Sequence, residues 1–122
     1  MDIDTALKEA MSIDGALGAS LVDYDSGMSL GSLGGGKYLN LEVASAGNTE
    51  VVRAKMRTLE SLGLKETIDD ILITLQRQYH LIRLVTEQGQ SGLFIYLALD
   101  RAKANLALAR HHLKRIEHEL AV

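Results

Sequence analysis

The segment from Gly31 to Lys37 has the spacing of a phosphate-binding loop, with a glycine, four residues, then Gly-Lys. Such loops hold nucleotide phosphates with backbone N–H groups and the lysine, and a Ser or Thr after the lysine binds magnesium. Tyr38 stands in that last position, and the preceding residues are typical of the second arm of a short hairpin. We therefore expect no nucleotide hydrolysis and interpret residues 34–36 as a flexible connection to a helix. ATP or GTP binding that is lost in Lys37→Ala would contradict this interpretation.

The histidines could in principle bind a metal ion, but they do not form the H-E-x-x-H pattern of zinc proteases. On one helix, His111 and His118 would lie about 10 Å apart along the axis, too far to share a metal without further ligands. We expect solvated helix positions for His111, His112 and His118, and no metal site. His80 stands among apolar strand residues, which favours a structural role.

Paired carboxylates for acid–base catalysis occur as Asp23 with Asp25 and as Asp69 with Asp70. The first pair lies in a turn-forming cluster and the second at the entrance of a predicted strand, so both are interpreted as structural. No serine lies in a G-x-S-x-G pattern, and the chain has no cysteine. We therefore expect no catalytic residue, no cofactor and no enzymatic activity.

The composition is typical of one folded domain over residues 1–122, because 47% of the residues are apolar and 24% are charged. A net charge of -3, without runs of like charge, argues against a nucleic-acid partner. No apolar stretch reaches the roughly 18 residues that a membrane span needs, and the first residues are acidic where a secretory signal is basic. With cysteine absent as well, we expect a cytoplasmic protein without membrane contact.

Helical periodicity and turn residues divide the first half of the chain into four predicted elements. Asp2 or Asp4 can cap a first helix, Asn40 can cap a second, longer one, and Gly63 ends it. A turn-forming cluster separates two strands of a β-hairpin. The elements are a helix at residues 3–12, strands at 16–23 and 28–33, and a helix at 41–62.

The second half is rich in β-branched and aromatic residues and predicts three strands in a meander. The last strand is apolar at every position, which places it at the centre of the sheet with helices on both sides. Asp100 is expected to cap a final amphipathic helix. We therefore predict an α/β sandwich with a five-stranded, mostly antiparallel sheet. The three strands are expected at residues 69–75, 79–85 and 93–99.

Apolar residues exceed what one sheet contact requires. The long helix carries them on two sides, and Gly47 within it costs about 1 kcal/mol relative to Ala, which another closely approaching backbone would explain. The segment from Ile71 to Leu75 is uncharged, so an edge position would leave it available for pairing. The alternative is that both segments belong to the core of a monomer. The helix residues concerned are Val52, Met56 and Leu59 on one side and Ala44, Val51, Ala54 and Leu62 on the other.

Several segments, together with the order of the elements, carry a family resemblance. They are Asp69 to Leu75, Gln78 to Arg83, Leu97 to Arg101, Ala104 to Ala107, the hairpin turn Asp23 to Gly27, and Val51 to Arg53. These resemble the Roadblock family, the fold of dynein light chains and GTPase regulators, and look like its stand-alone bacterial members. The resemblance covers essentially the whole chain and contains no catalytic signature.

The resemblance implies a profilin-like sheet ordered 2-1-5-4-3, with the long helix on one face and the terminal helices on the other. It also implies a two-fold homodimer in which third strands join into one sheet and middle helices pack side by side. The dimer residues implied here are Ala44, Gly47, Val51, Val52, Lys55, Met56, Leu59, Ile71, Ile73 and Leu75.

Bacterial relatives regulate small Ras-like GTPases, so the resemblance implies a non-enzymatic GTPase regulator whose middle helices face the partner. Arg53 and Arg57 lie one helical turn apart and are the candidate partner contacts, with a solvated helix face as the alternative. Two other functions stay open. One is a dimeric scaffold that docks a peptide or an adaptor complex, and the other is a small-molecule sensor, which would need a vacant apolar pocket.

Overall fold

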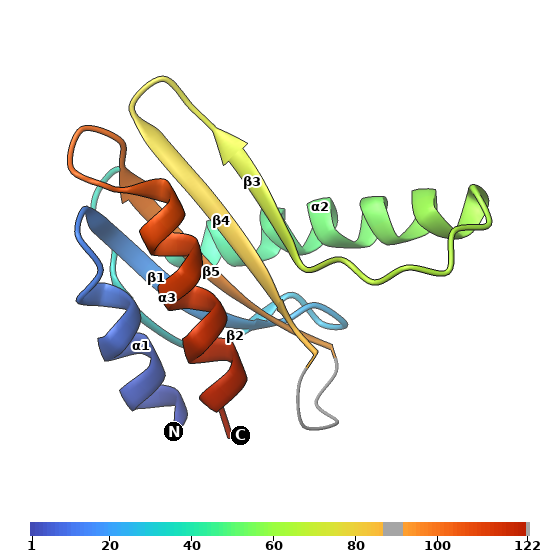
Figure 1. Cartoon of the computed structure of the whole chain (residues 1–122), viewed down its shortest axis with the longest axis horizontal. Helices are drawn as coiled ribbons and strands as arrows, with labels where there is room; N and C mark the ends of the chain where they lie inside the picture. Colours follow the sequence, from blue (N-terminus) through green and yellow to red (C-terminus); the bar gives the residue numbers. More distant parts are fainter. Residues whose placement is uncertain (87–91, 122) are drawn as a thin grey trace.

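In the computed structural model, which describes residues 1–86 and 92–121, three helices enclose a five-stranded antiparallel sheet (Figure 1). These elements agree with the predicted ones to within a few residues, except at the start of the last helix. In chain order they are α1 (Ile3–Met11), β1 (Ala16–Asp23), β2 (Met28–Gly34), α2 (Leu41–Ser61), β3 (Asp70–Thr74), β4 (Gln78–Val85), β5 (Leu93–Asp100) and α3 (Leu106–Glu119).

The strands follow the order β2-β1-β5-β4-β3, and every neighbouring pair is antiparallel. The uniformly apolar strand β5 lies at the centre, and its residues from Phe94 to Leu99 are all buried. α1 and α3 cover one face of the sheet and α2 crosses the other (Figure 1). The predicted fold class and the predicted strand order are therefore confirmed.

Side-chain alternation along the strands divides the interior into two apolar layers. Between the sheet and the terminal helices, Leu81 and Leu97 pack against α1 and α3. On the opposite face, Ile82, Phe94 and Val52 form the layer beneath α2. Both layers are buried, so the central strands of the sheet are covered on both faces.

Side-chain caps fix where the first two helices begin. Asp2 accepts a hydrogen bond from the Thr5 N–H at 2.8 Å, and this bond lowers the pKa of the Asp2 carboxyl. Asn40 accepts from the N–H groups of Glu42 and Val43 at 3.0 and 3.1 Å. Both caps were among the predicted ones.

The predicted cap of the last helix was wrong. Asp100 is the last residue of β5, and its carboxylate accepts from the Ala102 N–H at 3.0 Å within a turn. α3 begins later, where Asn105 accepts from the Leu108 N–H at 3.0 Å. Asp and Asn cap helices about equally well, so residue type alone does not decide between Asp100 and Asn105. The turn that precedes α3 places its start at the second of them, five residues later.

Among the described residues, no helix is both long and apolar enough to cross a membrane.

Candidate interaction surface

β3 forms one outer edge of the sheet and has none of the usual protective features of an edge strand. It pairs with β4 in an unbroken register from Asp70 opposite Arg83 to Thr74 opposite Tyr79. After Asp70, the strand has no charge, proline or glycine. The other edge, β2, carries a bulge at Leu30, where its register with β1 shifts. Bulges and charges discourage edge pairing, so β3 is the edge that is open to another strand.

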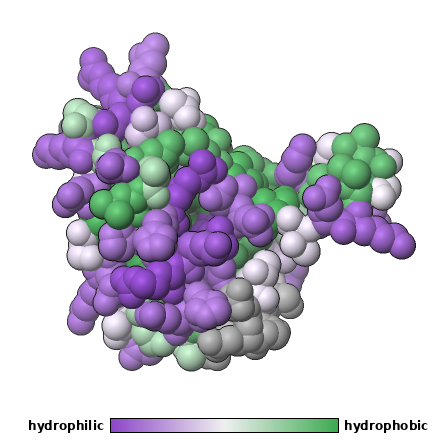
Figure 2. Space-filling view, in the orientation of Figure 1, coloured by the Kyte–Doolittle hydropathy of each residue, from purple (hydrophilic) through white to green (hydrophobic). Residues whose placement is uncertain are grey.

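α2 is longer than the sheet is wide and runs past the β3 edge (Figure 1). Its buried residues all lie between Leu41 and Val52, in its first half. The rest of the helix and the turn after it form a projecting lobe with apolar surface (Figure 2), to which Leu62 and Leu64 contribute, 64% and 45% exposed. The end of α2 therefore projects beyond the sheet of its own chain.

The structure places the predicted dimer residues of α2 at different depths. Gly47, Val51 and Lys55 are exposed, and Ala44 is half-buried. Val52 is 0% exposed and belongs to the core beneath α2. Its side chain is therefore held within its own chain, and it is not part of the surface discussed below.

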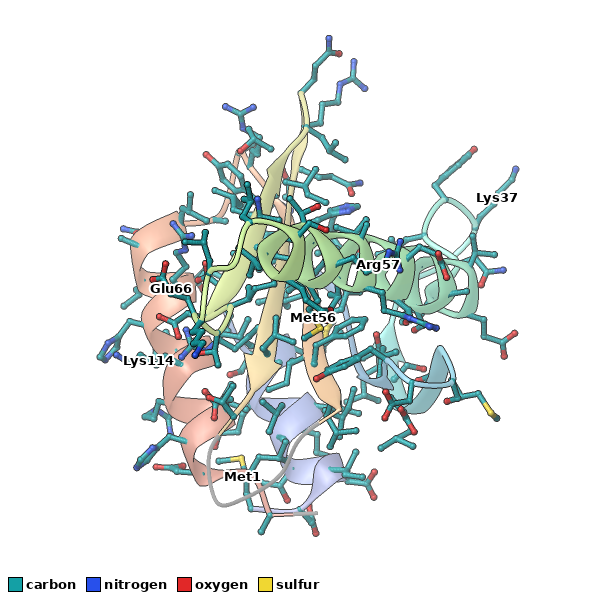
Figure 3. All side chains as sticks on the ribbon, turned by 90° about the vertical axis from the view of Figure 1, so that its right-hand side faces the viewer. Met1, Lys37, Met56, Arg57, Glu66 and Lys114 are labelled. Atoms are coloured by element: carbon teal, nitrogen blue, oxygen red, sulfur yellow. The ribbon has the colours of Figure 1, made fainter. Side chains whose placement is uncertain are left out.

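Further along α2, Met56 and Leu59 are half-buried, and both line a hollow on the helix side that faces the sheet. Arg53 and Arg57 are exposed, and within the described part of the chain neither forms an ion pair. Figure 3 shows Arg57 on α2. The two arginines are thus available to a partner.

The three predicted dimer residues of β3 and its end share the sheet face that α2 crosses. Ile71 packs against the core beneath α2, and Ile73, two residues on, points to the same face. Leu75 follows the strand and is 42% exposed. Ile73 and Leu75 thus lie at the β3 edge of the sheet, on the face that α2 crosses.

A chain of hydrogen bonds lies next to Ile73. His80 is its partner across the β3–β4 pair, and Nε2 of His80 lies 2.7 Å from Oε1 of Gln78. An amide oxygen only accepts, so Nε2 carries the proton and Nδ1 accepts from the Tyr96 hydroxyl at 3.1 Å. Burial raises the pKa of Tyr96 to about 12, although a hydrogen bond with Asn48 acts in the opposite direction. Burial also lowers the pKa of His80.

His80 and Tyr96 line a hollow of about 420 Å³ between the first half of α2, the loop at residues 37–40 and the sheet, which we call the histidine hollow. Val43, Ala44, Gly47, Asn48, His80 and Tyr96 contribute to its wall. Sequence reasoning predicted a structural role for His80 but missed its partners. His80 and Tyr96 become diagonal neighbours only through the β4–β5 register, which pairs His80 with Ala98 and Ile82 with Tyr96.

The glycines at residues 34–36, which have the spacing of a phosphate-binding loop, form a tight turn. Gly35 donates its N–H to the Leu17 carbonyl at 2.8 Å, and Gly36 donates to Leu39 at 3.1 Å. A Cβ on Gly34 would lie 2.7 Å from the Leu17 oxygen, and φ is positive at all three glycines. Gly34 and Gly35 are required by close packing and by positive φ, and Gly36 by its positive φ, so the connection interpreted as flexible forms a hydrogen-bonded turn. These N–H groups are also committed to protein acceptors.

The other candidate residues take structural positions. Asp23 accepts from the Asp25 N–H at 2.8 Å within the hairpin turn, and Asp70 accepts a two-pronged hydrogen bond from Arg110. In residues 1–86 and 92–121, no three or more His, Asp or Glu side chains form a group that could hold a metal ion. His111 is exposed on α3 and His112 is half-buried there.

Comparison with known proteins identifies the fold. No family model and no curated protein matches the sequence. Among solved structures, a Roadblock/LC7 domain from Streptomyces avermitilis aligns with a TM-score of 0.78 at 12% identity, over 96% of this chain and 92% of that one. MglB from Myxococcus xanthus aligns with a TM-score of 0.73 at 17% identity, over 94% and 85%. The gliding protein MglB from Thermus thermophilus gives 0.71 at 20% identity, over 96% and 89%.

Proposed function

From its Roadblock/LC7 fold, we propose that this chain forms a two-fold homodimer that binds and regulates a small Ras-like GTPase without catalysing a reaction itself. One observation carries the proposal. α2 overhangs the sheet at the β3 edge, and the same sheet face holds an uncovered hollow close to that edge. Each chain therefore has a projecting helix end and an incompletely covered sheet, which is what a self-complementary interface requires.

The β3 edge determines how two chains would pair in the proposed dimer. When two β3 strands pair in antiparallel fashion about a two-fold axis, the two sheets become one, and the free backbone groups of both edges are satisfied. The same axis carries the second half of each α2 across the edge and onto the face of the other sheet. That face presents Ile73 and the histidine hollow, while the arriving helix end presents Leu62.

The dimer forms a platform of two α2 helices, which is where we place the GTPase. Arg53 and Arg57 are exposed on this helix, and cationic side chains there suit acidic groups of a partner. A regulator of this kind need not insert a catalytic arginine. Contacts that favour one arrangement of the GTPase switch segments are enough to change the rate of nucleotide turnover.

The test begins with affinity capture by the tagged dimer from the source cells, followed by purification of any small GTPase that is retained. GTP hydrolysis and nucleotide exchange are then measured with and without the dimer. We expect a changed turnover rate that is lost in Arg53→Ala/Arg57→Ala, while Arg115→Ala on α3 serves as the charge control and keeps the effect. If no small GTPase binds and no turnover rate changes, the regulatory role is wrong. Retention of an adaptor protein instead would favour the scaffold function.

A further inference from the structure

A second hollow lies beneath the end of α2, at the opposite end of β4 from His80. It has a volume of about 450 Å³, and we call it the helix-end hollow. Three segments enclose it, namely the second half of α2, the connection at residues 64–68 and the last residues of β4, and Tyr24 closes one side. Figure 3 shows Met56 on the helix that covers it and Glu66 on the connection. The proposed function needs no ligand in this space, although the predicted dimer residues Met56 and Leu59 line it.

The floor and walls of the helix-end hollow are apolar. Leu84 and Val85 are each only 3% exposed and form a floor that belongs to the core. Met56, Leu59 and Ile68 are half-buried and form the sides. An apolar group that enters the hollow would remove these surfaces from water, which is favourable by about 25 cal/mol per Å² buried.

Backbone hydrogen bonds hold the walls in place. The Leu64 N–H donates to the Leu59 carbonyl at 3.0 Å and ties the connection to the helix. The Leu84 N–H donates to the Asp69 carbonyl at 3.1 Å and ties the far end of the connection to the sheet. Pre-formed, mostly apolar spaces of about 300–1,000 Å³ are typical of small-molecule sites.

The polar groups at the hollow select the charge of its occupant. Glu60 and Glu66 both line it, one from the helix and one from the connection, and its described lining contains no Lys, Arg or His. Thr67 and Thr86 add hydroxyl groups. A ligand with an anionic group would be repelled by the two carboxylates, whereas a cationic group would be attracted to them.

We propose that the helix-end hollow binds a small amphipathic cation. The apolar body of the ligand lies on Leu84 and Val85, and its ammonium group lies beside Glu60 and Glu66. This site uses neither the exposed arginines nor the histidine hollow, but it shares Met56 and Leu59 with the predicted dimer interface.

The experiment uses octylammonium and octanoate as probes, which share a chain length and differ in the sign of their charge. Both are titrated below their micelle concentrations into the full-length, isotope-labelled protein, and the amide shifts of Leu64, Ile68 and Val85 are followed by NMR. We expect saturable binding of octylammonium, about three- to fivefold tighter than octanoate, which is the scale of exposed ion pairs.

Two variants and a matched control separate the site from general detergent binding. Glu60→Gln/Glu66→Gln should remove the preference for octylammonium, while Glu42→Gln/Glu50→Gln, the same charge change in the other half of α2, should keep it. Ile68→Trp fills the hollow and should remove binding of both probes, with an unchanged circular dichroism spectrum showing that the variant is folded.

Three outcomes would overturn the proposal. These are equal affinities for the two probes, binding that Ile68→Trp leaves intact, and binding that occurs in Ile73→Lys but not in the wild type. The last outcome would mean that a second copy of the chain covers the hollow. None of these results depends on whether a GTPase is bound, so the two proposals are tested separately.

Discussion

The hydroxyl of Tyr96 donates a hydrogen bond to Nδ1 of His80 across 3.1 Å, at the wall of a hollow that α2 only partly covers. The two rings also meet edge to face, with centroids 5.4 Å apart. Gln78 accepts from the other ring nitrogen at 2.7 Å. The neutral imidazole therefore satisfies both neighbours at once, and a proton on Nδ1 would take the place of the Tyr96 hydrogen bond.

The first prediction concerns acid stability. Burial lowers the pKa of His80 below its ordinary value of 6.5, so below about pH 6.5 the unfolded chain binds a proton that the folded chain does not. The contribution of His80 to the free energy of unfolding should be constant above about pH 7 and fall on acidification, by at most about 1.4 kcal/mol per pH unit. Urea denaturation at pH 8.0, 6.5 and 5.5, at one protein concentration, measures it.

The control for this prediction is a second histidine. His80→Gln should reduce the loss of stability between pH 6.5 and 5.5, whereas His111→Gln, at an exposed position of α3, should leave it unchanged. Lys37 is the charged side chain that shares the histidine hollow, and Lys37→Gln tests its contribution. Equal pH profiles for the wild type and His80→Gln would show that the burial of His80 does not govern acid stability.

The second prediction concerns the assembly state. Ile73→Lys places a charge on the β3 edge, so the variant should be a monomer, while the wild type should have about twice the chain mass of 13.3 kDa. Leu30→Lys is the matched control, because it adds the same charge to the other edge strand at a bulged position. Size exclusion with light scattering measures the mass of each of the three proteins, and Leu30→Lys should have the same mass as the wild-type dimer. A wild-type monomer at micromolar concentration would contradict the dimer and with it the platform.

The apolar pattern of the later strands was sufficient for the fold class and for the central strand, while the full strand order was implied by the family resemblance. The uniformly apolar run from Leu93 to Leu99 could only lie in the middle of a sheet with both faces covered, and β5 does. The start of the last helix was not predictable in the same way. Asp100 and Asn105 are both good caps, and the turn between them decides which one caps the helix. In that turn the Ala104 N–H donates to the Asp100 carbonyl at 2.9 Å.

The surface features depend on geometry that no local pattern encodes. The two hollows exist because α2 crosses the sheet at an angle and continues past it, and a helical repeat does not specify a crossing angle. Met56 and Leu59 show the consequence, since their spacing indicates an apolar face but not what it faces. In the structure they line the helix-end hollow. Whether the dimer contacts them stays a prediction.

The third prediction concerns a buried ion pair. Glu117 is 1% exposed, and one of its oxygens accepts from Nε and Nη2 of Arg83, each at 3.3 Å, while the other oxygen has no partner among the described residues. Arg83→Met leaves this carboxylate buried without a cation, which should lower the free energy of unfolding by about 3–5 kcal/mol. Urea denaturation at pH 7 measures the loss.

Two further variants test that reason for the loss. Arg83→Met/Glu117→Leu removes both charges and should recover most of the stability, because an apolar pair of similar volume often replaces a buried ion pair without cost. Arg115→Met breaks exposed pairs with Glu9 and Glu119 and should cost at most about 1 kcal/mol. A loss in Arg83→Met as small as that in Arg115→Met would show that Glu117 is not held by Arg83.

The last prediction concerns Gly47, which is an unfavourable residue in the middle of a helix. A Cβ added at this position would meet nothing within 4 Å among the described residues of its own chain, so their packing does not require glycine there. In an isolated chain, Gly47→Ala should therefore raise the free energy of unfolding by about 1 kcal/mol, measured in the monomeric Ile73→Lys background. In the dimer, the same methyl group would lie where the second α2 approaches.

Opposite effects of one substitution on folding and on assembly would thus reveal the helix contact. Gly47→Ala in the wild-type background should weaken the dimer, measured as a higher dissociation constant in sedimentation equilibrium, although the individual chain is more stable. Glu50→Ala changes an exposed residue of the same helix and should not reproduce this combination. If Gly47→Ala leaves the dissociation constant unchanged or lowers it, the two α2 helices do not approach at Gly47. The dimer would then be held together by the β3 edges alone.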